Sequence, residues 1–124
     1  SGRAQNMVAL GAAAPYLPLP QALMERFIEV LFQKKGDKII VTNINAFRYG
    51  MANGRFFVAM RAAGADAHRT LAVMDRLDSA TIDPDVAPAW ADLCASSRFD
   101  AFTAWAADNP KGRVPGTADQ AGAF

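Results

Sequence analysis

Alanine dominates the apolar content of this chain and limits the core that the chain can form. Of its 124 residues, 52% are apolar, and 26 of these apolar residues are alanine. Alanine side chains let helices approach closely but bury little area each. A chain of this length hides roughly two-thirds of the surface that its unfolded form exposes, which suffices for one domain without disulfides or bound metal. We therefore expect one small helical domain whose alanine-rich helices need something larger packed against them.

Apolar residues recur at the spacing of amphipathic helices along much of the chain. The clearest helix is predicted from Pro20 to Lys35, because proline suits the first helical position and Gly36 can terminate the helix. Its apolar side chains recur every three or four residues and are Leu23, Met24, Phe27, Ile28 and Leu31. Other helices are predicted from Arg55 to the break at Gly64, from an Asp66 cap to near Asp78, from Pro88 to Ser96-Ser97, and from there to Asn109-Pro110. This pattern predicts a mainly α fold, a small bundle of four to six helices.

Residues 38–54 fit two different structures. The β-branched run from Ile39 to Thr42 is typical of a strand, and Asn53-Gly54 favours a tight turn, so one solution is a hairpin within Lys38 to Met60. The other solution is a helix capped by Asn45, which has to carry two interior glycines at a cost of about 1 kcal/mol each relative to alanine. The sequence leaves this choice open.

Both ends of the chain are rich in Gly, Ala and Pro, a composition typical of segments that stay irregular unless something holds them. We expect an extended N-terminal arm at residues 1–19, a single helical domain at 20–108 and an irregular C-terminal arm at 109–124. Contacts with another chain are the simplest way to hold both arms.

Four apolar residues are the predicted protein-interaction site. Prolines extend the N-terminal arm around Tyr16, Leu17 and Leu19, and these side chains can lie in a groove on another chain. Folding of the arm back onto its own domain is the alternative. Trp105, near the end of the last predicted helix, is a candidate exposed anchor for a partner's pocket.

The sequence lacks the residue sets that an enzyme or a metal site needs. It has one cysteine, Cys94, and one histidine, His68, which can form neither a disulfide nor a zinc ligand set. The spacing from Trp90 predicts that Cys94 packs as a small apolar residue. No phosphate-binding loop or metal motif occurs, and acidic pairs fall where helix caps are routine. We therefore expect no catalytic residues, no metal, no cofactor and no small-molecule substrate.

The same features predict the surroundings of the protein. A single cysteine indicates a reducing compartment such as the cytoplasm. No apolar run approaches the roughly 20 residues that a membrane-spanning helix needs, so we expect a soluble protein without a membrane partner.

Arginines gather in the middle third of the chain, several of them two helical turns apart: Arg48, Arg55, Arg61, Arg69 and Arg76. Residues 58–77 also resemble a helix-turn-helix with its turn at Gly64, which places His68, Arg69 and Thr70 at the start of a recognition helix. A formal net charge of +1 excludes a strongly basic protein but not a local basic face. The alternative is that the arginines are solvated or paired with nearby aspartates. Candidate nucleic-acid ligands are therefore Arg55, Arg61, His68, Arg69 and Arg76.

A short segment bears on that hypothesis. Trp90-Ala91, the run from Arg98 to Phe102, and Asn109-Pro110 resemble a segment in the coat proteins of flexible filamentous plant viruses. The resemblance implies a mostly helical chain that binds RNA through basic residues and links subunits through its terminal arms.

Together these observations favour a non-enzymatic structural or protein-interaction module that self-assembles through its terminal arms and binds copies of itself. The alternative is a nucleic-acid-binding protein that uses the arginine-lined, helix-turn-helix-like segment, including a nucleocapsid-like role.

Overall fold

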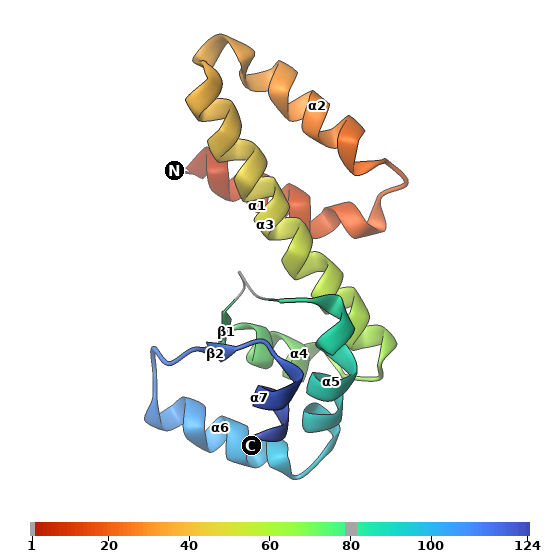
Figure 1. Ribbon diagram of the computed structural model, residues 1–124, viewed down its shortest axis with the longest axis vertical. Coiled ribbons are helices and arrows are strands. Elements are labelled where there is room, and N and C mark those ends of the chain that lie inside the picture. The colour runs from red at the N-terminus through yellow and green to blue at the C-terminus, as the bar shows by residue number, and fades with distance from the viewer. Residues whose placement is uncertain (1, 79–81) are drawn as a thin grey trace. The chain divides into compact units, whose positions relative to one another are not determined.

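A computed structural model describes residues 2–78 and 82–124, and in these residues it is mainly α-helical (Figure 1). They contain seven α-helices and one small two-stranded parallel sheet, which confirms the predicted mainly α fold. The chain divides into two compact units, Ser1–Arg55 (unit 1) and Phe56–Phe124 (unit 2), where the sequence predicted a single helical domain. Within the described ranges, none of the helices combines the length and hydropathy that a membrane span requires.

Unit 1 is built from helices whose apolar positions meet in a small core. Its elements are α1 (Gly2–Ala13), the 3-10 turn η1 (Ala14–Tyr16), α2 (Gln21–Phe32), the 3-10 turn η2 (Gln33–Lys35) and the first part of α3 (Asp37–Ala62). The buried side chains of this core are Ala14, Met24, Ile28, Phe32, Phe47 and Met51. Helix α2 followed by η2 confirms the helix predicted over residues 20–35.

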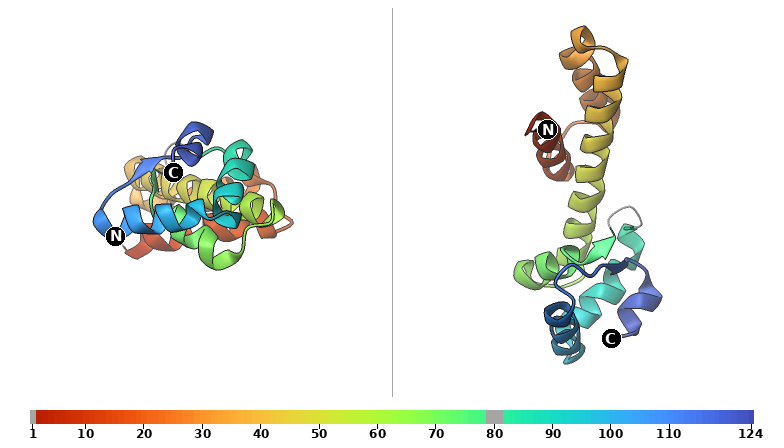
Figure 2. Two further views of the ribbon diagram at one scale, coloured as in Figure 1. Left: turned by 90° about the horizontal axis from the view of Figure 1, so that it is seen from below. Right: turned by 90° about the vertical axis from the view of Figure 1, so that its left-hand side faces the viewer.

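The N-terminal segment is a helix and not an extended arm, because small residues let α1 dock against α3 (Figure 2). A Cβ atom on Gly50 would lie only 1.9 Å from the carbonyl oxygen of Val8, and one on Gly11 only 2.0 Å from that of Phe47. Gly54 makes a similar approach to α1. The two backbones therefore touch, and burial of α1 holds residues that would otherwise stay irregular.

The same contact explains why residues 38–54 are helical and do not form a hairpin. The interior glycines that weaken a helix locally, Gly50 and Gly54, are the residues that admit α1. Asn53, half of the predicted turn, donates a hydrogen bond from Nδ2 to the Tyr49 carbonyl inside the helix, 3.1 Å away. The helix begins directly after Gly36, whose φ of 94° ends the preceding turn, so Asn45 is not a cap.

Unit 2 has the larger core of the two. After the end of α3 it contains α4 (Ala67–Met74), β1 (Leu77–Asp78), the 3-10 turn η4 (Pro84–Val86), α5 (Ala87–Ala95), α6 (Arg98–Asp108), β2 (Val114–Pro115) and α7 (Ala118–Gly122). Its largest fully buried side chains are Phe56, Met60, Val73, Leu77, Trp90, Leu93 and Phe102. Strands β1 and β2 are parallel, with Leu77 beside Val114.

Residues 109–124 belong to the core of unit 2 and are not an irregular arm. Strand β2 pairs with β1, and Thr117 caps α7 by accepting a hydrogen bond from the Gln120 amide. Ala121 is buried, and the Phe124 ring lies 5.3 Å from the Phe102 ring between centroids. The sequence could not indicate this packing, because it joins residues far apart in the chain.

Candidate interaction surface

Among the described residues of unit 1, none packs against one side of α2. Its buried side chains, Met24, Ile28 and Phe32, face the core of unit 1. Four further apolar side chains on this helix are 51–64% exposed, and we call them the exposed α2 face: Leu23, Phe27, Val30 and Leu31. At 100° per residue the apolar positions of α2 span an arc of about 200°, wider than a single neighbouring layer covers. The helix is therefore apolar on two sides.

A hollow of about 570 Å³ lies beside this face, and we call it the apolar groove. Its lining residues are apolar except for one arginine: Leu10, Leu17, Leu19, Leu23, Met24, Arg26, Phe27 and Val30. Contributions come from α1, from the segment between η1 and α2, and from α2 itself. The groove and the exposed α2 face thus form one continuous apolar surface within unit 1.

Exposed apolar side chains are concentrated in unit 1. Among the described residues, ten of the eleven exposed large apolar side chains lie there, and the other is Leu71 in unit 2. A monomeric protein rarely exposes a large contiguous apolar area unless it is a binding site. Unit 1 is therefore the candidate location of an interaction surface.

The structure places three of the four predicted interaction residues at the surface. Leu17 and Leu19 are 40% and 48% exposed and line the apolar groove, while Tyr16 is exposed outside its lining. Trp105 is half-buried against the rings of Phe102 and Phe124, so it does not stand out as an anchor.

The exposed α2 face was not predicted from the sequence, because helical spacing placed Leu23, Phe27 and Leu31 in the same apolar stripe as their buried neighbours. The excessive width of the apolar arc is the signal that could have separated the two sides of the helix.

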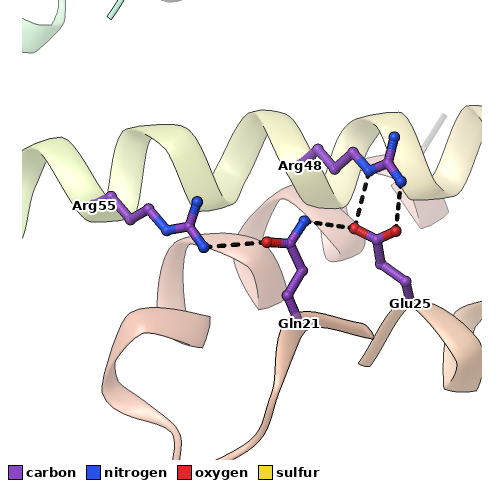
Figure 3. Close-up of polar contacts among 4 residues, drawn as sticks. All are labelled: Gln21, Glu25, Arg48 and Arg55. Carbon is purple, nitrogen blue, oxygen red and sulfur yellow. Dashed lines mark hydrogen bonds and ion pairs between the residues drawn. The ribbon is translucent and has the colours of Figure 1, made fainter. Parts of the chain in front are cut away.

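A row of polar side chains fixes how α2 is turned toward α3 (Figure 3). Arg48 donates to both oxygens of Glu25, from Nε at 2.9 Å and from Nη2 at 2.6 Å. Gln21 donates to Glu25 Oε2 at 2.7 Å and accepts from Arg55 Nη2 at 3.1 Å. These contacts hold one side of α2 against α3 and leave the exposed α2 face turned away from it.

These contacts predict that the stability of the protein depends on pH through the Glu25 carboxyl. The hydrogen bonds from Arg48 hold the pKa of the Glu25 carboxyl below its ordinary value of 4.5. Because the folded-state pKa is the lower one, the stabilisation is present above pH 4.5 and is lost as the pH falls through the lowered pKa. Thermal melts followed by circular dichroism should show that Glu25→Gln has a lower melting temperature at neutral pH and a smaller loss on acidification.

A matched control is Glu29→Gln, which removes the same charge from a more exposed carboxylate of the same helix. This variant should retain the acid dependence of the parent protein. Equal pH profiles for Glu25→Gln and the parent would contradict the role of the ion pair.

The arginine side chains of the predicted stripe form hydrogen bonds inside their own units. Arg48 and Arg55 belong to the polar row, and Arg61 donates to the carbonyl of Ala65 at 3.1 Å. Arg76 makes the most such bonds, since its guanidinium donates to three backbone carbonyls in the last turn of α6 and just after it: Ala106, Asn109 and Gly112.

The helix-turn-helix prediction is confirmed only in its local features. Gly64 has a φ of 101° at the turn, and Asp66 caps α4 by accepting from the Arg69 amide. At the start of α4, Thr70 is fully buried, and Arg69 lies over the Phe99 ring and donates to the Cys94 carbonyl. Helix α4 ends at Met74, so Leu77 lies on β1. The helix-turn-helix motif would instead require Leu77 to lie on the second helix. Of the three residues predicted at the start of the recognition helix, His68 alone is exposed.

No protein-family model, curated protein or solved structure matches this chain. The resemblance to coat proteins of filamentous plant viruses therefore finds no support, and the function has to be inferred from this chain's own surface.

The cysteine is placed for packing. Cys94 is 2% exposed in the core of unit 2, and burial raises the pKa of its thiol to about 11, which keeps it protonated and unreactive at neutral pH. In the part of the chain that the structure describes, no three His, Cys, Asp or Glu residues gather closely enough to hold a metal ion.

Proposed function

We propose that this chain is a non-enzymatic protein-interaction module that self-associates through unit 1, using the apolar groove and the exposed α2 face. The single observation that carries the proposal is the second apolar side of α2, where Leu23, Phe27, Val30 and Leu31 face water. Covering these side chains removes apolar area from water, which contributes about 25 cal/mol per Å² in favour of association against the entropy that binding costs.

The chemistry of the surface favours a protein over a small polar ligand. The lining of the apolar groove includes one charged side chain, Arg26, whereas a small-molecule site places several polar groups to orient its ligand. The groove also continues onto the exposed α2 face, which gives the extended apolar strip that a partner helix needs. The predicted arm residues Leu17 and Leu19 contribute as one wall of the groove.

Nucleic-acid binding is the weaker proposal. Four of its five candidate side chains, Arg55, Arg61, Arg69 and Arg76, donate hydrogen bonds within the chain, which reduces the donors left for phosphates. Among the described residues, His68 is the one candidate of the five that is exposed and makes no such bond.

Light scattering across a range of protein concentrations tests the proposed function. The parent protein should show a mass above that of one chain, and Phe27→Asp should reduce it to a single chain, because a charge then stands at the centre of the apolar strip. Leu71→Asp is the control, since Leu71 is 58% exposed but lies in unit 2. It should associate like the parent, and a parent protein that stays monomeric at every concentration overturns the proposal.

A further inference from the structure

A polar hollow of about 270 Å³ lies in unit 2, and we call it the basic hollow. Its lining residues are Asp75, Arg76, Pro110, Lys111, Gly112 and Arg113. Residues 56–124, which form unit 2, contain nine aspartates and six Lys or Arg residues, so the unit as a whole is acidic. Three of those six cations line the basic hollow, and its local charge is therefore opposite to that of the unit around it.

The parallel sheet brings the two halves of the basic hollow together (Figure 1). Leu77 of β1 pairs with Val114 of β2 in the parallel sense, so the segments that enter the two strands lie at the same edge of the sheet. Arg76 directly precedes β1, and Arg113 directly precedes β2. The Val114 amide also donates to the Arg76 carbonyl at 2.8 Å. The backbone therefore fixes these two cationic positions next to each other.

Arg76 holds the loop that carries the other two cations. Its side chain is 17% exposed, and its guanidinium donates to the carbonyls of Asn109 at 2.6 Å and Gly112 at 3.3 Å. Between these two residues the chain makes a tight turn, in which the Gly112 amide donates to the Asn109 carbonyl at 2.8 Å. Asparagine followed by proline is typical of the start of such a turn. Lys111 is therefore presented from an ordered backbone, which lowers the entropy that ligand binding costs.

The basic hollow presents hydrogen-bond donors that the chain itself does not use. In the part of the chain that the structure describes, the exposed side chain of Lys111 has no hydrogen bond or ion pair. Arg113 donates from Nη1 to the Leu77 carbonyl at 3.1 Å, and its other guanidinium N–H groups have no partner among the described residues. The Arg76 guanidinium adds positive charge, with Asp75 Oδ2 lying 3.4 Å from its Nε. Three cations against one carboxylate leave the lining with a formal excess of two positive charges.

We infer that the basic hollow binds a phosphate monoester group. Such a group carries a charge of about −1.5 to −2 at neutral pH and three acceptor oxygens, which match the charge of the lining and the donors of Lys111 and Arg113. Each phosphodiester of a nucleic acid carries a single negative charge, so the match favours a monoester. The lining has no large apolar side chain, so the recognised part of the ligand is the phosphate itself. This inference concerns unit 2 and does not depend on the proposed self-association through unit 1.

Titration with O-phosphoserine, followed by NMR spectra of the ¹⁵N-labelled protein, tests the inference. The amides of residues 111–113 should shift in a saturable manner, and serine should shift none of them. Lys111→Gln and Arg113→Gln should each weaken binding at least about tenfold, because each removes a charge-assisted hydrogen bond. Both side chains are exposed, so amides elsewhere in unit 2 should keep their positions. Lys34→Gln removes the same charge from unit 1 and is the control, which should bind like the parent.

A further variant separates recognition of the ligand from a structural role. Asp75→Asn removes the carboxylate that lines the basic hollow, and its side chain is 76% exposed. It should bind O-phosphoserine about fivefold more tightly, because its negative charge no longer opposes the ligand. Dimethyl phosphate, which carries one charge, should bind the parent at least about tenfold more weakly than O-phosphoserine.

The outcomes are distinct. Absence of saturable shifts in the parent overturns the inference, as does unchanged binding in both Lys111→Gln and Arg113→Gln. Dimethyl phosphate that binds as tightly as O-phosphoserine also overturns it, because the monoester is then not selected. With saturable binding in the parent, a phosphoserine flanked by alanines in a short peptide distinguishes the two sources of the group. Tighter binding of the peptide than of free O-phosphoserine supports a phosphorylated protein as the ligand, whereas equal or weaker binding supports a small phosphorylated molecule.

Discussion

Replacing Gly50 with alanine should destabilise unit 1, although alanine is the better helix former. Alanine in a helix interior gains about 1 kcal/mol over glycine. The added Cβ, however, would lie 1.9 Å from the carbonyl oxygen of Val8, and a backbone atom cannot turn aside as a flexible side chain can. Overpacking of this kind costs about 1–3 kcal/mol, and the need to move α1 away from α3 places this substitution at the upper end. After the gain of about 1 kcal/mol in helix propensity, we expect a net loss of about 2 kcal/mol.

Hydrogen exchange measured by mass spectrometry checks this prediction. Amides of α1 should exchange at least ~10-fold faster in Gly50→Ala, because their protection depends on the close contact. Gly122→Ala is the control, since a Cβ at that helical glycine meets nothing within 4 Å. Its stability should be unchanged or slightly higher. A Gly50→Ala protein as protected as the parent would show that α1 does not pack on α3 as described.

Deleting residues 117–124 should disrupt unit 2. The deletion removes α7 with its buried Ala121 and the Phe124 ring, whose centroid lies 6.5 Å from that of Trp90 and 5.7 Å from that of Trp105. It also removes the Ala121 carbonyl, which accepts a hydrogen bond from Arg98 at 2.8 Å. Phe124 is partly buried, so its loss costs less than the about 3–5 kcal/mol of a fully buried aromatic side chain. Because the whole of α7 and the hydrogen bond from Arg98 are lost with it, we expect a deletion of this size to leave unit 2 largely unfolded.

Tryptophan fluorescence reports on this prediction directly, because both tryptophans of the chain lie in unit 2. The emission of the truncated protein should shift to the red and its cooperative unfolding transition should be lost. Phe124→Leu, which keeps an apolar side chain at the same place, should fold with reduced stability. If the truncated protein keeps native emission and stability, the C-terminal residues are an appended arm after all.

Local signals predicted the elements whose ends are fixed by nearby residues. Pro20 and Gly36 delimit the segment of α2 and η2, Gly64 supplies the positive φ of the turn, and Asp66 caps α4 as expected. Each of these features depends on residues within one or two helical turns, and that range is what propensity and capping describe.

The predictions that were wrong concern contacts between distant parts of the chain. The glycines of α3 look unfavourable for a helix until α1 is brought against them, and nothing near Gly50 in the sequence indicates that Val8 does so. The C-terminal segment was likewise judged on composition, whereas Phe124 is held by rings far from it in sequence.

The candidate site was predicted in part for a similar reason. The prolines around Leu17 and Leu19 mark an exposed apolar segment locally, so these two residues were found. Helical periodicity shows that α2 is rich in apolar residues but not how many neighbours are present to cover them. Leu23 and Phe27 therefore became recognisable as surface residues only when the core of unit 1 was seen.

The small core of unit 1, six buried apolar side chains, has a consequence for how the protein behaves on dilution. If a second copy completes this unit, mass action ties the order of the first half of the chain to how much of the protein is present. In such a molecule the order of unit 1 depends on the protein concentration, whereas unit 2 stays folded at any concentration.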